Sequence, residues 1–258
     1  MSNSQPVTII TGASAGIGLA TAHRLAADGH NLLLTARRQQ RLTNLLADLK
    51  STPGHHTILA GDIGDETFCQ QLINHTLTTY GHLDILINNA GVGHRSHLAN
   101  LAPADARHLL NTNLLGPLYL CHFAIPHLQQ RPRPQIINIS SIISQRPMPN
   151  GAFYTASKTA LNHLSRGLRI ELAHTNICVT TVYPGLTATE FHTATLSATN
   201  NNPRMKYRTP ASRVAHKIAL AIRYQQQEVY ITPFDWLFTH LNRLFPRTLD
   251  FVFRYYTP

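Results

Sequence analysis

The sequence predicts an α/β fold with one doubly wound parallel sheet of about seven strands and helices on both faces. Short segments rich in Val, Ile and Leu alternate with longer segments of helical apolar spacing, and short connections join them. This alternation is typical of parallel sheets, because parallel strands are joined by helical crossovers. No internal repeat or interdomain linker interrupts the 258 residues, so residues 1–258 are expected to form a single domain.

The expected strands are short apolar runs, and a turn follows each of them. They cover Val7–Thr11, Asn31–Ala36, Thr57–Ala60, Leu83–Ile87, Gln135–Ile139, Ile177–Tyr183 and Val229–Thr232. The expected helices run from Leu19 to a stop at Asp28-Gly29, and over Leu42–Leu49, Asp65–Tyr80, Pro103 to about Gln130, Tyr154 to about His174, and Pro210–Tyr224. Pro117 and Pro126 are expected to kink or interrupt the helix that contains them, because proline has no N–H to donate.

A glycine-rich turn follows the first strand directly and reads Gly12-Ala13-Ser14-Ala15-Gly16-Ile17-Gly18. Gly12 allows a tight turn, and the later glycines let a pyrophosphate approach the backbone and the N-terminus of the next helix. The alternative is an ordinary tight turn between a strand and a helix. The strand on one side and the helix on the other favour a phosphate cradle.

The second strand ends in Ala36-Arg37-Arg38, without an acidic residue. Folds that bind NAD usually place Asp or Glu about 20 residues after the glycines, where it holds the ribose 2′-hydroxyl. A guanidinium at this place suits a 2′-phosphate instead. The alternative is a solvated helix start, although arginine at a helix N-terminus opposes the helix dipole. The sequence therefore predicts NADP(H) as the cofactor.

Other polar residues are expected at the same edge of the sheet, because ligands bind at the carboxyl ends of parallel strands. These are Asp62, the run Asn88-Asn89-Ala90-Gly91, and Ser140-Ser141. Asn113 stands inside an expected helix, where its side chain competes for backbone hydrogen bonds. By itself, Asn113 is explained by a buried structural hydrogen bond.

The stretch Tyr154-Thr155-Ala156-Ser157-Lys158 places a phenol and an ammonium one helical turn apart. Tyrosine loses its proton near pH ~10, so acid–base work near neutrality needs a pKa about 3 units lower, or roughly 4 kcal/mol. A cation one turn away would supply part of this shift. Many helices carry such a pair by chance, so the surrounding motifs decide its meaning.

These motifs, in this order, resemble the short-chain dehydrogenase/reductase family over roughly residues 6–232. The matching residues are Thr11-Gly12, Gly16, Gly18, Asn88-Asn89-Ala90-Gly91, Asn113, Ser141, Tyr154, Lys158 and Pro184-Gly185. The resemblance implies a Rossmann-like fold of the NADP(H)-preferring type. It also implies four catalytic residues: Tyr154 as general acid and base, Lys158 to lower its pKa and hold the nicotinamide ribose, Ser141 to bind the substrate oxygen, and Asn113 to bind a water connected to Lys158.

The resemblance further implies a set of cofactor contacts and no metal site. Asp62 would face the adenine, Asn89 the adenosine ribose, and Ser14 with Arg37, and less certainly Arg38, the 2′-phosphate. The full set is Gly12, Ser14, Gly16, Ile17, Gly18, Arg37, Arg38, Asp62, Ile63, Asn89, Ala90, Gly91, Tyr154, Lys158, Pro184, Gly185, Leu186, Thr187 and Thr189.

Two features depart from the family pattern. Ser144 stands where many members have glycine, and is expected to narrow the pocket slightly. His94 and Arg95 follow the Asn-Asn-Ala-Gly motif. They are interpreted as solvated loop residues, with substrate contact as the alternative.

The C-terminal quarter is expected to hold a substrate lid at about 188–210 and an amphipathic extension at 234–258. Apolar residues recur at helical spacing from Phe234 to Phe245, while Arg243 and Arg247 lie outside this stripe. Packing on the core or on another subunit is favoured; peripheral membrane contact and a cover over the substrate are the alternatives. The resemblance implies a homodimer or homotetramer.

The net charge of +10 is concentrated near the end, where residues 191–258 hold nine Lys or Arg against three acidic residues. No nucleic-acid module or dense basic stripe accompanies it, so a nucleic-acid partner is not expected. Three widely spaced cysteines indicate a reducing compartment. Neither a signal peptide nor an apolar run of ~18 residues is present, so a cytoplasmic protein is expected, with a position peripheral to a membrane as the alternative.

The predicted activity is the interconversion of a carbonyl and an alcohol by NADP(H)-dependent hydride transfer, on a lipophilic substrate. One alternative is a hydroxyacyl or hydroxy-acid oxidoreductase that uses Arg204 or Arg208 of the lid. The other is a non-catalytic module that binds NADP(H) as a sensor or scaffold. The combination of Asn113, Ser141, Tyr154 and Lys158 argues against the module, since binding alone does not need all four.

Overall fold

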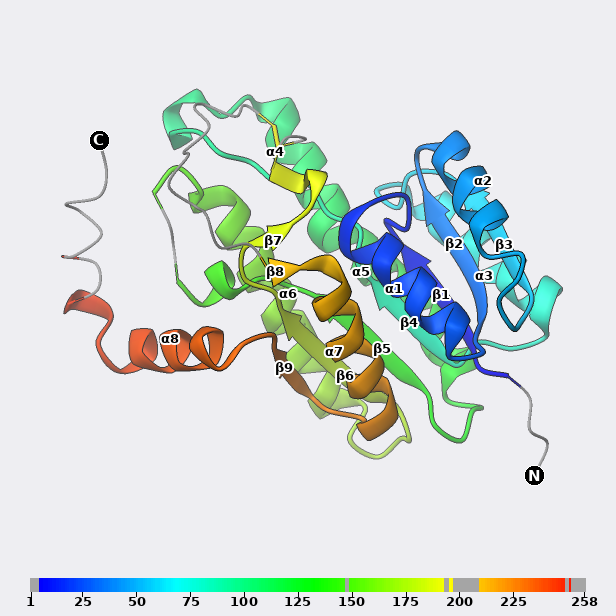
Figure 1. Ribbon diagram of the computed structural model, residues 1–258. Helices are drawn as coiled ribbons and strands as arrows, with labels where there is room; N and C mark the ends of the chain where they lie inside the picture. The colour runs from blue at the N-terminus through cyan, green and yellow to red at the C-terminus, as the bar shows by residue number, and fades with distance from the viewer. Residues whose placement is uncertain (1–4, 147–148, 193–194, 197–208, 249–250, 252–258) are drawn as a thin grey trace.

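Seven parallel strands form one sheet in the order β3-β2-β1-β4-β5-β6-β9 (Figure 1). The computed structural model describes residues 5–146, 149–192, 195–196, 209–248 and 251. The predicted fold class is confirmed. The strands are β1 (Val7–Thr11), β2 (Asn31–Ala36), β3 (His56–Ala60), β4 (Ile85–Asn88), β5 (Gln135–Ile139), β6 (Cys178–Tyr183) and β9 (Glu228–Tyr230).

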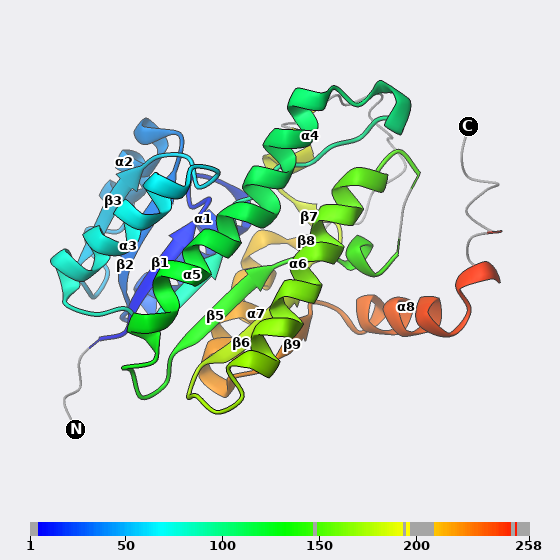
Figure 2. The same ribbon diagram turned by 180° about the vertical axis from the view of Figure 1, so that it is seen from behind.

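Helices cover both faces of this sheet. One face carries α1 (Gly16–Ala27), α2 (Gln39–Asp48) and α7 (Ala211–Tyr224), which lie in front of the sheet in Figure 1. The other face carries α3 (Glu66–Tyr80), α5 (Gly116–Leu128) and α6 (Ala152–Glu171), which lie in front in Figure 2. Each layer buries its own apolar cluster against the sheet. Burial of this apolar surface is the main favourable contribution to folding.

The order of the strands reverses at β1. The chain moves outward from β1 to β2 and β3, then returns to place β4 on the other side of β1, with Ile10 opposite Ile87. Crevices at such reversals are where open α/β sheets bind their ligands. The glycine turn follows β1, so it lies at this crevice.

The helical segment from Pro103 is interrupted, as predicted, but at Asn111–Leu115. This stretch is a π-helical turn between α4 (Pro103–Leu110) and α5, and the Gly116 N–H reaches the Asn111 carbonyl. Pro117 has no N–H to give to the carbonyl of Asn113, four residues earlier, so the ordinary hydrogen bond cannot form there. Pro126 lies inside α5 without ending it.

A second, two-stranded sheet brackets the predicted lid. Strand β7 (Thr187–Ala188) pairs with β8 (Thr209–Pro210), and a short 3-10 helix, η4 (Glu190–His192), follows β7. The basic residues expected in the lid, Arg204, Lys206 and Arg208, fall outside the described residues.

The C-terminal helix α8 (Pro233–Leu244) extends away from the sheet (Figure 1). It starts at a capping box, in which Thr232 and Asp235 exchange hydrogen bonds between side chain and backbone. Two further 3-10 helices, η1 (Leu98–Asn100) and η3 (Ile142–Gln145), lie at the carboxyl edge of the sheet.

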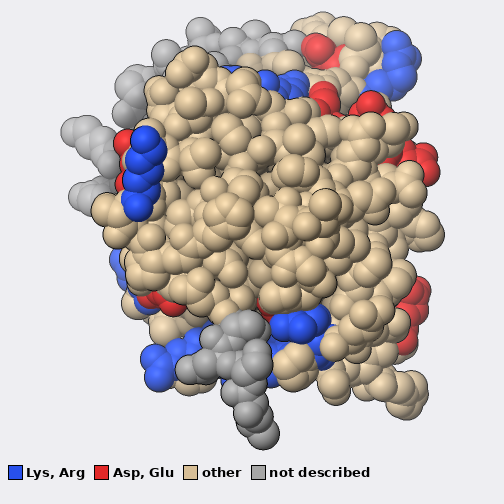
Figure 3. All heavy atoms as spheres, turned by 90° about the vertical axis from the view of Figure 1, so that its right-hand side faces the viewer, with Lys and Arg blue, Asp and Glu red and all other residues tan. Residues whose placement is uncertain are grey.

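Charged side chains are sparse on the face shown in Figure 3, where Lys and Arg lie in separate groups near the rim. This face carries no continuous basic surface. Within the described part of the chain, no helix combines the length and the apolar character needed to cross a membrane.

Candidate active site

A cleft of about 700 Å³ opens at the carboxyl edge of the sheet. One end is polar, and includes Ser14, Arg37, Arg38 and Asp62. The other end is largely apolar, and its wall includes Ile142, Ile143, Phe191, Phe234 and Phe238. Tyr154, Lys158 and nearly all the other predicted site residues line the cleft. The exceptions are Gly18 and Asn113, which are buried and do not line it.

The glycine turn is closely packed against the end of β4. Gly12 and Gly16 have φ angles of +67° and +57°, which side chains rarely adopt. A Cβ added to Gly18 would lie 2.4 Å from the Gly12 carbonyl oxygen and 2.5 Å from Asn89 Nδ2. These glycines therefore leave the main chain bare on the side of the cleft, as a phosphate cradle requires.

Asn89 holds this turn in place. Its Nδ2 donates to the Thr11 carbonyl at 2.8 Å, and its own N–H donates to the Thr11 hydroxyl at 2.9 Å. The ends of β1 and β4 are thereby tied together. Contact between Asn89 and an adenosine ribose stays a prediction, and the amide nitrogen already has this structural partner.

Arg38, and not Arg37, forms hydrogen bonds with Ser14. Nε and Nη2 of Arg38 lie 3.3 and 3.1 Å from the Ser14 hydroxyl, whereas Arg37 Nη1 lies 3.2 Å from His108 Nε2. Which of the two arginines would bind a 2′-phosphate stays a prediction. Arg38 immediately precedes α2, so its side chain reaches back over the glycine turn, while Arg37 extends toward α4.

Ser141, Tyr154 and Lys158 meet at the boundary between the polar and apolar ends. Tyr154 is 9% exposed and Lys158 is 4% exposed. Burial raises the pKa of the Tyr154 phenol, and its hydrogen bond with Ser141 lowers it by a smaller amount. This differs from the expected net lowering. The physical reason is desolvation of the phenolate, which outweighs the stabilising contact.

Lys158 lies against the end of β5. Its Nζ donates to the Ile139 carbonyl at 2.9 Å. Burial lowers the pKa of Lys158 to about 8, because the ammonium has lost most of its water. The side chain is still mainly charged at neutral pH, and it becomes neutral in the mildly alkaline range.

The side chain of Asn113 is fully buried and joins two elements. Its Oδ1 accepts from the Val92 N–H at 2.8 Å, and its Nδ2 donates to the Val92 carbonyl and to the Ser157 hydroxyl. The structural hydrogen bond considered from the sequence thus accounts for the side chain. A water bound by Asn113 stays a prediction.

Two expectations about the substrate side were wrong. His94 is not solvated but 4% exposed, because a β-bridge with Leu196 covers it and Ser96 binds its Nε2. Ser144 does not narrow the pocket, because its hydroxyl turns inward to Asn162 and to the Ser141 carbonyl. Arg95 is exposed and lines the mouth of the cleft.

Helix α8 contacts the cleft and also presents apolar residues to solvent. Phe234 and Phe238 line the cleft, and Asn242 ties the helix to Gln145 and Arg146 beside η3. Phe234 is nevertheless 71% exposed, and so, to a lesser extent, are Trp236, Leu237, Leu241, Leu244 and also Phe245 just beyond the helix. Complete packing on the core is therefore excluded for the described part of the extension. Residues 249–250 and 252–258 lie outside it.

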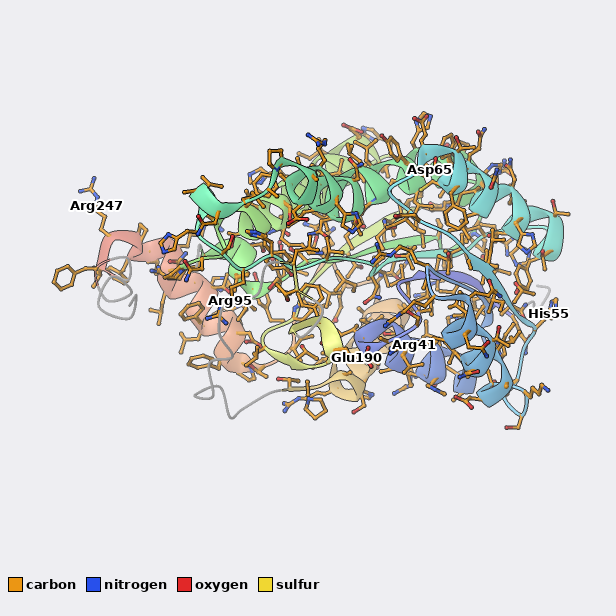
Figure 4. The ribbon with its side chains drawn as sticks, turned by 90° about the horizontal axis from the view of Figure 1, so that it is seen from above. Arg41, His55, Asp65, Arg95, Glu190 and Arg247 are labelled. Carbon is orange, nitrogen blue, oxygen red and sulfur yellow. The ribbon has the colours of Figure 1, made fainter. Side chains whose placement is uncertain are left out.

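The sequence analysis missed Ser157, Phe191 and Glu190. Ser157 bridges Asn113 and the Tyr154 carbonyl, and the Phe191 ring lies 5.8 Å from the Tyr154 ring. Glu190 forms ion pairs with Arg41 and Arg38 at the polar end of the cleft, and Figure 4 shows it beside Arg41. Its only signal in the sequence is an isolated acid shortly after Pro184-Gly185.

The chain belongs to the short-chain dehydrogenase family, whose pattern matches residues 6–200. It is 38% identical over 183 residues to the 11-beta-hydroxysteroid dehydrogenase-like 4A of Arabidopsis thaliana, which covers 70% of this chain and 60% of that relative. It is 34% identical over 187 residues to sulfoacetaldehyde reductase 2 of Chromohalobacter salexigens, covering 72% of this chain and 74% of that relative. The family consists of oxidoreductases that use nicotinamide dinucleotides.

Solved structures of the same fold hold either form of the cofactor. A short-chain dehydrogenase/reductase from Burkholderia phymatum, in complex with NAD, superposes with a TM-score of 0.87 at 21% identity, covering 96% of both chains. A short-chain dehydrogenase from Sphingobium yanoikuyae, in complex with NADPH, gives 0.80 at 26% identity, covering 94% of this chain and 95% of that one. The choice between NAD(H) and NADP(H) thus depends on this chain's own residues.

The lowered pKa of Lys158 predicts a specific dependence of stability on pH. Between a folded pKa of about 8 and the usual 10.5, the unfolded chain binds more protons at this residue, so its contribution to stability rises with pH. The difference in unfolding free energy between wild type and Lys158→Met should increase by about 2 kcal/mol from pH 8 to pH 10. Urea denaturation at several pH values measures it. Lys50→Met, at an exposed lysine, should show no such trend, and a flat difference for Lys158→Met would contradict the prediction.

Proposed function

We propose that the protein is an NADP(H)-dependent oxidoreductase that interconverts a carbonyl and a primary or secondary alcohol, with Tyr154 as general acid and base. The observation that carries this proposal is the grouping of Ser141, Tyr154 and Lys158 in one cleft. Membership of the short-chain dehydrogenase family supports it. A non-catalytic NADP(H) module, the alternative, has no need of a buried phenol bonded to a serine.

The residues of the polar end fit a phosphorylated dinucleotide. The glycine turn suits a pyrophosphate, because glycines let a phosphate approach the main-chain N–H groups and the N-terminus of α1. Arg38 and Ser14 together offer the guanidinium and hydroxyl donors that a 2′-phosphate accepts. No carboxylate stands at the end of β2 to bind a free 2′-hydroxyl. These contacts support NADP(H) over NAD(H).

Tyr154 and Ser141 would share the reacting oxygen of the substrate. A buried phenol of raised pKa keeps its proton at neutral pH, which is the form that donates during reduction of a carbonyl. The Ser141 hydroxyl donates a second hydrogen bond and stabilises negative charge as it develops on that oxygen. In the oxidative direction, the same phenol receives the alcohol proton.

Lys158 supports proton transfer through its charge. As an ammonium it stabilises the phenolate form of Tyr154 and donates to ribose hydroxyls of the cofactor. The cofactor, when bound, supplies or accepts the hydride. The protein contributes the positions of the hydrogen-bond donors.

The apolar end supports a lipophilic substrate. Ile142, Ile143, Phe191, Phe234 and Phe238 offer wide apolar contact beside Tyr154. The relative named for a hydroxysteroid dehydrogenase is consistent with such a substrate. A hydroxyacyl or hydroxy-acid substrate is the alternative, and its carboxylate or phosphate would need a cation. Arg95 lines the cleft and could serve, whereas Arg204 and Arg208 lie outside the described residues.

We also propose a homodimer or homotetramer. Leu118 on α5 and Ile170 on α6 are exposed apolar residues, and the exposed residues of α8 add more apolar surface. The alternative is a cytoplasmic protein whose extension, residues 234–258, contacts a membrane surface. Light scattering at micromolar concentration should give a multiple of the 28.7 kDa chain. A monomer that floats with anionic liposomes would contradict the oligomer and favour the membrane.

Tyr154→Phe removes the transferable proton and keeps the ring. Turnover of ketones and aldehydes, followed by NADPH absorbance, should fall by about 10²–10⁴-fold, as expected for loss of a general acid. NADPH affinity should stay within about twofold, since the phenol is not needed to hold the phosphates. Tyr224→Phe, at an exposed tyrosine, is the matched control and should retain full turnover. Equal turnover by the two variants would refute the catalytic assignment.

Arg38→Ala tests the cofactor preference. Loss of a charge-assisted contact to the 2′-phosphate should weaken NADPH binding about 10–100-fold and leave NADH binding nearly unchanged. Arg37→Ala, at the neighbouring residue that contacts His108, should have the smaller effect. Fluorescence titration gives all four dissociation constants. NADPH binding that is indifferent to both substitutions would refute the preference for NADP(H).

A further inference from the structure

A carboxylate stands beside the arginine proposed to bind the 2′-phosphate. Glu190 Oε2 lies 2.6 Å from Arg41 Nη1 and 3.4 Å from Arg38 Nη1. Figure 4 shows Glu190 and Arg41 pointing toward one another across the polar end of the cleft. The acid comes from η4, which follows β7, whereas the two arginines border α2 or lie within it.

Any anion bound at the polar end must share Arg38 with this carboxylate. Arg38 contacts the Ser14 hydroxyl through Nε and Nη2, and Glu190 through Nη1. All three residues line the same cleft. A phosphate carries up to two negative charges, so it competes with Glu190 for the guanidinium and is also repelled by it.

Glu190 is charged under ordinary conditions. Its hydrogen bond with Arg41, and then the nearby charges, hold the pKa of this carboxyl below its usual value, so it is ionised at neutral pH. The three side chains are roughly half exposed. Exposed ion pairs contribute little net stability, so a ligand can displace this one.

The neighbours of Glu190 hold it at this place. Thr189 is packed against the glycine turn, where a Cβ on Gly16 would lie 3.0 Å from Thr189 Cγ2. On the other side, the Phe191 ring contacts the Tyr154 ring. The backbone of residue 190 is thus fixed between the phosphate cradle and the catalytic phenol, and only its side chain is left to change partners.

We propose that Glu190 weakens the preference for NADP(H) by competing with its 2′-phosphate for Arg38. Its carboxylate lowers the affinity for ligands with a 2′-phosphate and leaves the affinity for those without one unchanged. When such a ligand binds, Glu190 keeps the shorter contact to Arg41 and gives up the longer contact to Arg38. The inference depends on the proposed preference for NADP(H), because it assigns Arg38 to the 2′-phosphate.

Glu190→Gln tests the competition by removing the charge and keeping the shape. Calorimetry at low salt should show that adenosine 2′,5′-bisphosphate and NADPH bind about 3- to 10-fold more tightly to this variant, the size expected for release of one exposed charged contact. Binding of adenosine 5′-monophosphate and NADH should change less than about twofold. Glu171→Gln makes the same charge change at the far end of α6 and should bind all four ligands as wild type does.

The outcomes separate this inference from the proposed function. A wild-type protein that binds the bisphosphate no better than the monophosphate would refute the preference for NADP(H), and the role of Glu190 with it. If wild type prefers the bisphosphate while Glu190→Gln binds it equally or more weakly, Glu190 is not a competitor, and only this inference is overturned. An equal gain for all four ligands would likewise overturn it, since the effect would then not depend on the 2′-phosphate.

Discussion

The common direction of the seven strands is the constraint on which the site depends. Because β1, β4, β5 and β6 are parallel neighbours, the residues that follow each of them reach the same edge. Thr11, at the end of β1, therefore meets Asn89 after β4, and Ser140-Ser141 follows β5 within reach of α6. Thr11 and Asn89, 78 positions apart in the chain, are brought together in this way.

The burial of Lys158 at this edge of the sheet carries a cost in hydration. An ammonium that is 4% exposed loses hydration, and the Ile139 carbonyl supplies only part of the replacement. The same desolvation raises the pKa of Tyr154 and lowers that of Lys158, so both groups are shifted toward their neutral forms. Under the proposed function, the proton would therefore be transferred at a phenol whose charged state the burial disfavours.

The fold and the centre of the site were predictable because local patterns encode them. The apolar alternation predicts the parallel sheet, and the glycine turn and the Tyr154–Lys158 spacing have short-range meaning. Side-chain directions were not predictable from these patterns. The pair Arg37-Arg38 does not indicate which guanidinium turns toward Ser14, and the burial of His94 depends on a distant bridge to Leu196. Nothing near Glu190 in the sequence indicates that it meets Arg41, 149 positions away.

Helix α8 lines the pocket and also reaches the molecular surface. The apolar spacing of its sequence does not predict which of its residues do which. Spacing identifies a stripe but not what covers it, and here the stripe is divided between the cleft and solvent. Phe238 is part of the pocket wall, while Leu241 and Leu244 are exposed one and two turns further along the same helix. The capping box and the Asn242 contacts hold the helix at its two ends. A partner bound to the exposed residues of α8 would therefore contact a helix that also lines the apolar end of the cleft. Substrate binding and association at the surface thus depend on the position of the same helix.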